Sequence, residues 1–168
     1  STHRWFCSSP PSGMISAGDT IRAYYAEQWW FDIDENGHSS PCAGREGWYN
    51  HGTSVQACLN DSIVTGVGGT RYVFDHWSGD ASGTNSSASS SITMTAARTA
   101  IANWNSEYRV AFCAQTVVGS PLSSSNYAIV TVDGSPHNVW DGSCYAFWAA
   151  TGSTHPYSYG FNSSGSSS

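Results

Sequence analysis

The chain has 168 residues and a formal charge of −6, with six arginines and no lysine. A chain without a basic stripe offers no surface for phosphates, so no nucleic-acid partner is expected. The missing lysine excludes a Schiff base, a P-loop and a lysine–asparagine isopeptide crosslink. No apolar run approaches the roughly 18 residues needed to cross a bilayer, so membrane insertion is not expected.

Short apolar runs rich in aromatic and β-branched residues predict strands, because Gly, Ser, Asn and Asp separate them. In chain order the predicted strands are residues 20–25, 29–33, 71–74, 91–94, 108–112 and 127–132. The segment 95–104, "TAARTAIANW", is long enough for a helix but has no N-cap box, and most of it is predicted as strand. The dipeptides Asn36-Gly37, Asp133-Gly134 and Asp141-Gly142 indicate hairpins. The predicted fold class is therefore all-β.

Two internal similarities indicate repeated units. The stretch "EQWWFDI" at Glu27 resembles "EYRVAFC" at Glu107, and "WYNHGTS" at Trp48 resembles "WAATGST" at Trp148. The second unit ends early, and its missing half resembles the N-terminal stretch that begins "HRWFCSS". The predicted organisation is a half-repeat over residues 1–26, a complete β-repeat over 27–106, an incomplete repeat over 107–161 and a Ser/Gly-rich tail over 162–168.

The sequence "YVFDHWSGDASG" from Tyr72 to Gly83, followed by "SITMT" and "AIANW", resembles the divergent B-repeat domains of internalin-type surface proteins in bacteria and archaea. His76 stands where that pattern usually has glycine. The resemblance is good from Glu27 to Asn105, weaker to Phe161 and partial over residues 1–26. It implies small β-grasp-like or sandwich-like units that act as stalks, spacers or adhesive modules without catalysis.

Five cysteines and three sequons indicate an extracellular protein with disulfides and glycans. None of the cysteines forms a C-x-x-C pair, so zinc spacing is absent. The expected disulfides are Cys42–Cys58 and Cys113–Cys144, with Cys7 unpaired, although a bond from Cys7 to another chain would require a different pairing. The expected glycosylation sites are Asn60, Asn85 and Asn162.

A cluster of acidic, histidine and serine side chains raises the question of catalysis; it contains Asp75, His76, Ser78 and Asp80. A catalytic triad requires a base that reaches the nucleophile and a third group that orients the base. Residues so close in sequence rarely meet that requirement. The alternative is a β-corner in which Phe74 and Trp77 pack while Gly79 and Gly83 adopt positive φ. We favour the corner, and we expect no enzyme activity.

Two weaker ligand patterns remain as alternatives to plain structure. Asp32, Asp34 and Asn36 have the spacing of a calcium loop, but Ala43 stands where an EF-hand needs a carboxylate, so at most a calcium-stabilised turn is expected. The eight tryptophans could form a sugar-binding platform, although Trp48, Trp77 and Trp148 recur at equivalent positions, as core packing predicts.

A half-repeat at each end would leave open sheet edges and an unfilled apolar face. If residues 1–26 of one molecule complete residues 107–161 of its neighbour, a head-to-tail interface propagates into a fibre. The leading hypothesis is a subunit of an extracellular, pilus-like filament that polymerises with itself by strand complementation. The expected inter-subunit side chains are Trp5, Phe6, Ile15, Ile21, Tyr24 and Tyr25. The alternatives are a stalk or adhesion module of a larger cell-surface protein and a secreted carbohydrate-binding domain.

Overall fold

The structure is a computed structural model that describes residues 1–9, 12–115 and 127–162. These residues form strands and no helix, so the predicted all-β fold class is confirmed. The strands are β1 His3–Ser9, β2 Tyr24–Asp34, β3 Gly47–Asn50, β4 Ser54–Val55, β5 Ile63–Thr65, β6 Thr70–Gly79, β7 Ile92–Thr93, β8 Arg98–Cys113, β9 Tyr127–Val132, β10 Ser135–Val139, β11 Cys144–Ala150 and β12 Tyr157–Asn162.

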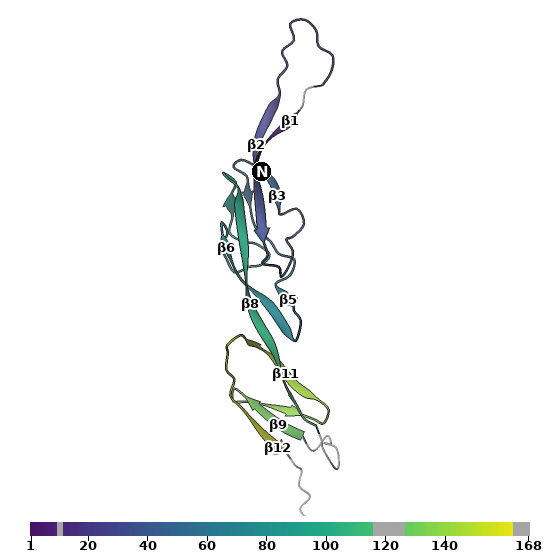
Figure 1. The fold of residues 1–168 in the computed structure, drawn as a ribbon, viewed down its shortest axis with the longest axis vertical. Helices are drawn as coiled ribbons and strands as arrows, with labels where there is room; N and C mark the ends of the chain where they lie inside the picture. Colours follow the sequence, from purple (N-terminus) through teal and green to yellow (C-terminus); the bar gives the residue numbers. More distant parts are fainter. Residues whose placement is uncertain (10–11, 116–126, 163–168) are drawn as a thin grey trace, which may run out of the picture. The chain divides into compact units, whose positions relative to one another are not determined.

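The strands pair in three sheets. The largest has the order β1-β2-β8-β6-β5, with β3 added to β2 and β11 added to β8. A second sheet has the order β10-β9-β12, and β4 pairs with β7. Most of these pairs are antiparallel, but β2 and β8 run parallel. The described chain divides into two compact units (Figure 1): unit 1 is Ser1–Val64 with Tyr72–Asn105, and unit 2 is Thr65–Arg71 with the chain from Ser106 onward.

Unit 1 is built from two halves that share one core. We call residues 27–64 its first half and residues 72–105 its second half. The first half contributes Phe31, Ile33, Val55, Ala57 and Leu59, and the second contributes Trp77, Ala81, Ile92, Met94, Ala100 and Ala102. Parallel pairing of β2 with β8, from Phe31 opposite Arg98 to Asp34 opposite Ile101, joins the halves. Burial of these apolar side chains from both halves stabilises the unit.

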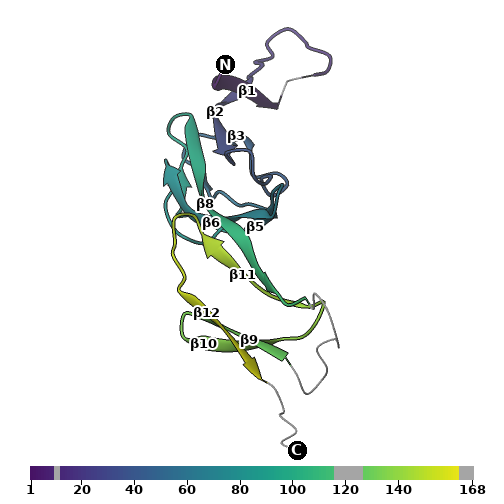
Figure 2. The ribbon, with the colours of Figure 1, turned by 60° about the horizontal axis from the view of Figure 1, so that its bottom comes forward.

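Unit 2 has a smaller core between two layers. Val130, Val132 and Val139 of the β10-β9-β12 sheet are buried, and Phe112 and Tyr145 of the β8–β11 pair are among the partly buried residues that pack against them. Figure 2 shows β9, β10 and β12 side by side next to the β8–β11 pair. Asp133 and Gly134 join β9 to β10 with φ of 50° and 79°, as the predicted two-residue hairpin requires.

Some local predictions differ from the structure. The predicted strand 20–25 begins only at Tyr24. Asn36-Gly37 forms a turn with positive φ at both residues, but β2 pairs with the more distant β3, so the turn does not close a two-residue hairpin. Asp141-Gly142 lies between β10 and β11, which do not pair with each other, so the predicted hairpin there is wrong. The segment 98–104 is strand, as predicted.

Candidate functional site

The stretch around Trp77 is a packed corner of unit 1. Trp77 is only 2% exposed, its ring lies 5.2 Å from that of Phe74, and its indole N–H donates to Asn85 O. Gly79 has a φ of 78°, and a Cβ there would come within 2.7 Å of the backbone oxygen of Thr99. The corner therefore requires glycine at this position for both conformation and space.

The acidic, histidine and serine side chains of this corner do not form a catalytic relay. His76 Nδ1 lies 2.8 Å from Asp75 Oδ2, and both side chains are about half exposed. The Ser78 hydroxyl instead accepts a hydrogen bond from Asn103 Nδ2 at 2.8 Å. Asp80 is bound on the other side of the corner, where its carboxylate accepts from Thr99 N–H at 2.9 Å and from Arg98 at 2.8 Å. The base and the nucleophile therefore have different partners.

Asp80 ties the corner to β8. The hydrogen bond from Thr99 N–H is the main reason that the pKa of Asp80 lies below its ordinary value, and the Arg98 guanidinium lowers this pKa further while partial burial opposes both effects. The side chain is 32% exposed, so solvent screens the ion pair with Arg98. Its role is to hold the turn that follows β6 against the start of β8.

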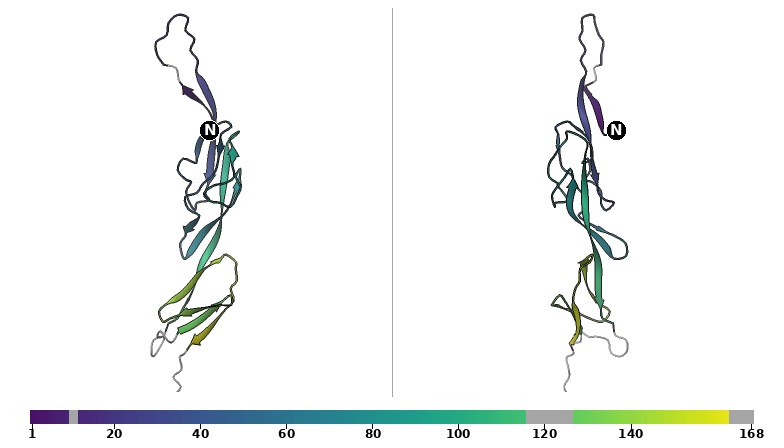
Figure 3. Two further views of the ribbon diagram at one scale, coloured as in Figure 1. Left: turned by 180° about the vertical axis from the view of Figure 1, so that it is seen from behind. Right: turned by 60° about the vertical axis from the view of Figure 1, so that its left-hand side comes forward.

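The N-terminal arm, residues 1–26, is a hairpin with an uncovered apolar surface. β1 pairs antiparallel with the start of β2. Figures 1 and 3 show this hairpin and its loop extending beyond the other strands of unit 1. The six predicted inter-subunit side chains are between 47% and 71% exposed, and Met14 is fully exposed. The arm therefore presents more apolar surface than a chain alone in water would favour. The predicted contacts of these side chains with a second chain stay a prediction.

The arm contacts the rest of unit 1 in the same way that the first two residues of β6, Thr70 and Arg71, contact the rest of unit 2. The Arg4 guanidinium lies over the ring of Trp48 at 4.4 Å, and the Arg71 guanidinium lies over the ring of Trp148 at 4.6 Å. Trp48 is on β3 and Trp148 is on β11. Each arginine thus stacks on the tryptophan that recurs in the two repeats. β1 in unit 1 is the structural counterpart of the beginning of β6 in unit 2.

Backbone hydrogen bonds extend this correspondence. Trp30 N–H donates to Thr2 O at 3.0 Å, and Arg109 N–H donates to Gly69 O at 2.8 Å. Trp30 is opposite Trp48 in the first ladder, and Arg109 is opposite Trp148 in the second. The structural counterpart of Trp30 is therefore Arg109.

The same correspondence corrects the sequence comparison by one residue. Arg4 Nε donates to the Gln28 side chain and Arg71 Nε donates to the Glu107 carboxylate. Gln28, and not Glu27, therefore corresponds to Glu107. Likewise, "HRWFCSS" corresponds to the residues around Arg71, because the arginines align the two strands.

The described residues of unit 2 leave part of its core face open. Tyr157 and Tyr159 of β12 are opposite the buried residues Val132 and Val130 of β9, so they share the core face of the sheet. Nevertheless Tyr157, Tyr159 and Phe161 are between 56% and 62% exposed. The ring of Phe112 contacts those of Tyr157 at 5.2 Å and Tyr159 at 6.0 Å, but it covers them only in part.

Both expected disulfides are present. Cys42 is bonded to Cys58, and Cys113 at the end of β8 is bonded to Cys144 at the start of β11. Each bond stays within one unit. Cys7 on β1 is a free, partly exposed thiol. A bond from Cys7 to another chain would leave these two pairings intact.

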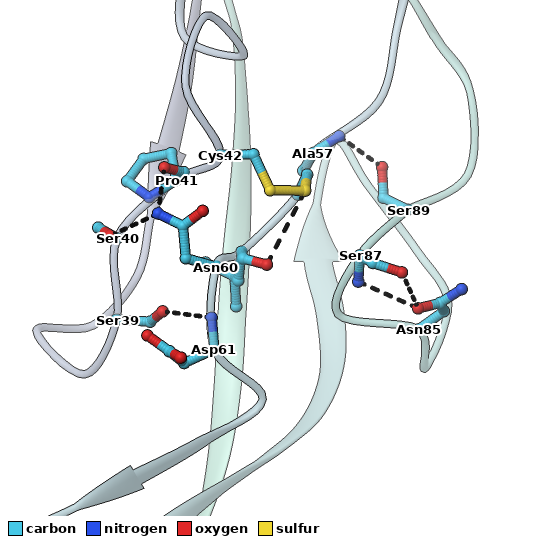
Figure 4. Close-up of a disulfide and its surroundings, with 12 residues drawn as sticks. Ser39, Ser40, Pro41, Cys42, Ala57, Asn60, Asp61, Asn85, Ser87 and Ser89 are labelled. Atoms are coloured by element: carbon cyan, nitrogen blue, oxygen red, sulfur yellow. Dashed lines mark hydrogen bonds between the residues drawn. A yellow bond between two sulfur atoms is a disulfide. The ribbon is translucent and has the colours of Figure 1, made fainter.

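The sequons differ in how their asparagine is engaged (Figure 4). Asn85 Oδ1 accepts from the N–H and the hydroxyl of Ser87, which leaves the amide nitrogen without a hydrogen bond to the described residues. Asn60 Nδ2 donates to Ser40 Oγ at 2.9 Å and to Pro41 O at 3.1 Å. Asn162 ends β12, and the rest of its sequon lies outside the described residues.

The calcium hypothesis gains no support from the geometry. Asp34 Oδ1 accepts from Asn36 N–H, and the Asn36 amide donates to Ala102 O. Within residues 1–9, 12–115 and 127–162, no group of three or more His, Cys, Asp or Glu side chains is placed to hold a metal ion. Glu27, whose two carboxylate oxygens lie 3.2 Å from His3 Nε2 and from His51 Nδ1, is not part of such a group either.

One hydrogen-bonded group of side chains in unit 2 was not predicted from the sequence. Ser153 Oγ lies 2.9 Å from His155 Nε2, and His155 Nδ1 lies 2.7 Å from Asp133 Oδ2. The order resembles a serine hydrolase triad. However, the Ser153 hydroxyl donates to Ala150 O at 2.7 Å, in the same turn in which Ser153 N–H donates to that oxygen. The group therefore closes a turn, and only the spacing Ser-x-His hinted at it.

Comparison with known proteins agrees with the resemblance seen in the sequence. A family model described as "Divergent InlB B-repeat domain" matches residues 33–107. This part of the chain is therefore similar to divergent B-repeat domains, and the predicted resemblance is confirmed. That family is a repeat domain of surface proteins and not a known enzyme family. Searches among curated proteins and among solved structures find no match. The described residues contain no helix long and apolar enough to cross a membrane.

Proposed function

We propose that the protein is a non-enzymatic structural subunit of an extracellular, pilus-like filament, in which the arm of one chain completes unit 2 of the next by strand complementation. The observation that carries the proposal is the matched stacking of Arg4 on Trp48 and of Arg71 on Trp148. It indicates that the arm corresponds to the second half of a repeat. The first half of that repeat would be supplied by another chain and not by residues 27–64.

Exposure supports the same proposal from both partners. In unit 1 the second half supplies the buried Trp77, Ile92 and Met94, whereas the apolar side chains of the arm are exposed. In unit 2 the exposed tyrosines Tyr157 and Tyr159 lie on the core face. Joining the two surfaces would remove apolar area from water on both sides, at about 25 cal/mol per Å².

An extracellular location is part of the proposal. B-repeat domains occur in surface proteins, and two disulfides persist in an oxidising compartment. A glycan on Asn85 would add polar surface to a chain in which only 11% of residues are charged. The stacked arginines and the sheet ladders need no cofactor.

Deletion of residues 1–26 tests the proposal. The unit 1 core contains no arm residue, so the shortened chain should still fold. Strand complementation predicts that the full chain forms fibres by electron microscopy and that the shortened chain stays monomeric in sedimentation. Fibres of undiminished length from the shortened chain would contradict it.

The second candidate is a stalk or adhesion module of a larger surface protein, which the family match favours. In that case the arm and unit 2 would be completed by neighbouring repeats of the same polypeptide. The two candidates differ in one observable: the purified chain of 168 residues forms fibres in the first case and remains monomeric in the second. Carbohydrate binding stays a prediction without a dedicated site in the described residues.

A further inference from the structure

We propose that the acceptor for the arm is the free edge of β8 from Val110 to Cys113, together with the aromatic face of β12, and that a second copy of this chain adds its residues 19–22 there as a parallel strand. This inference rests on the proposed function and defines its acceptor site, orientation and register. The site lies entirely within unit 2.

The first step is the edge of β8. On one side, Glu107–Cys113 pairs with β11. On the other side, β8 pairs with β6 and with the residue before it, and the last backbone hydrogen bond of this contact is from Arg109 N–H to Gly69 O. Beyond that point no named strand of the described chain pairs with this edge. Unpaired backbone groups on such an edge are a template for an additional strand.

The second step is the corresponding edge in unit 1, which is occupied. There Trp30 N–H donates to Thr2 O, and directly after it Phe31 becomes the parallel partner of Arg98. Because Arg109 corresponds to Trp30, Val110 corresponds to Phe31. The strand that the described residues of unit 2 do not supply is thus the counterpart of Arg98–Ile101.

The third step identifies the occupant. The one-residue correction above, in which Gln28 corresponds to Glu107, places Asp19–Arg22 at the position of Arg98–Ile101. In this alignment Thr20 is equivalent to Thr99, Ile21 to the buried Ala100 and Tyr25 to Trp104. The side chains that would face the core, Ile21 and Tyr25, are 55% and 62% exposed in the single chain. Their exposure is what an unused core strand would show.

The fourth step concerns the loop of the arm. The same alignment places Ile15 at the position of Met94, which is fully buried. In unit 1 Met94 N–H donates to Thr53 O and Met94 O accepts from Gly52 N–H, both at 2.9 Å. Ile15 of the second copy would make these bonds to Ser153 and Gly152, which form the matching turn of unit 2.

The fifth step is the cover over β12. Tyr145 of β11 stacks on His137 of β10 at 3.6 Å, while Phe112 of β8 contacts Tyr157 of β12. In the packing of the two layers, β11 therefore lies over β10, and β8 lies on the side of β12. A strand added to the free edge of β8 lies over the exposed face of β12 and covers Tyr159.

Disulfide trapping tests the register. In unit 1 Thr99 is opposite Asp32, so the proposal places Thr20 of one chain opposite Ala111 of the next. In a Cys7→Ser background, a chain carrying Thr20→Cys and Ala111→Cys should give a ladder of covalent oligomers on a non-reducing gel, because neighbouring strands bring Cα atoms within disulfide range. The matched control carries Arg22→Cys with Ala111→Cys, a pair that is two residues out of register and whose Cα atoms lie about 8 Å apart.

The outcomes separate the two proposals. A ladder from the Thr20 pair and none from the Arg22 pair supports this acceptor. Fibres with no ladder from the Thr20 pair, or with an equal ladder from both pairs, overturn the acceptor and leave the filament intact. Absence of fibres and oligomers in the unmodified chain overturns the proposed function itself.

Side-chain variants provide an independent readout. Ile21→Ser in the donor and Tyr159→Ser in the acceptor should each raise the concentration needed for polymerisation about tenfold, from lost apolar burial. Mixed together, they should not rescue one another fully, because three of the four possible donor–acceptor pairings in the mixture retain at least one defect. Val67→Ser removes a 91% exposed apolar side chain that is not part of the proposed acceptor and should have no effect. An effect of Val67→Ser equal to that of Tyr159→Ser would contradict the assignment.

Discussion

Substitution of Trp77 by alanine should unfold much of unit 1, because this side chain is buried at the centre of the corner. The ring is 2% exposed and packs on Phe74, and its indole N–H donates to Asn85 O. Truncation of a buried tryptophan costs about 3–5 kcal/mol. Asn85 is exposed, so water can replace the lost donor and no buried acceptor is left unpaired. The cost therefore comes from lost packing and the resulting cavity.

The assay is urea denaturation followed by circular dichroism, with hydrogen exchange at Ala100 as a reporter of unit 1. Small domains have a total stability of about 5–15 kcal/mol, so the Trp77→Ala midpoint should fall sharply. His76→Ala is the matched control from the same strand, and its exposed position predicts a change within about 0.5 kcal/mol. A loss below about 1 kcal/mol for Trp77→Ala, or an equal loss for His76→Ala, would refute the corner interpretation.

Three further predictions concern other parts of the chain. Replacement of Cys42 and Cys58 by serine should lower the free energy of unfolding by about 3 kcal/mol, because the bond closes a loop with a sequence separation of 16; an unchanged urea midpoint would contradict this. The lowered pKa of Asp80 means that its stabilisation is present above its unfolded pKa of about 3.9 and is lost as the pH falls through the lower folded value. Asp80→Asn should therefore be less stable than the parent at pH 7 and equal to it at strongly acidic pH, and a difference independent of pH would argue against this cause. If glycans are added to the folded chain, mass spectrometry should find Asn85 occupied more than Asn60, whose amide is hydrogen-bonded; the reverse order would contradict the prediction.

Features decided by local sequence were predictable. A short apolar run rich in β-branched residues located β9 at Tyr127–Val132, and Asp133-Gly134 located its hairpin, because a two-residue turn fixes both strands around it. The corner around Trp77 was predictable for the same reason, since its glycines and aromatic residues lie within a few positions of each other.

Features that depend on distant partners were not predictable in detail. The sequence comparison aligned Glu27 with Glu107, whereas the arginine contacts and the strand ladders show that Gln28 is the counterpart. The register of a strand depends on the strand with which it pairs, and the sequence of one strand alone does not identify that partner. Thr20–Ala23 illustrates the same point, because this predicted strand has no partner among the described residues of its own chain and is not a strand in the structure.

The most direct test of the account is electron microscopy of the purified, unmodified chain at neutral pH. The account predicts unbranched fibres with a regular axial repeat, because each arm completes unit 2 of one neighbour and each unit 2 accepts one arm. A preparation that contains only monomers at concentrations of several milligrams per millilitre, with both disulfides formed, would contradict polymerisation by strand complementation.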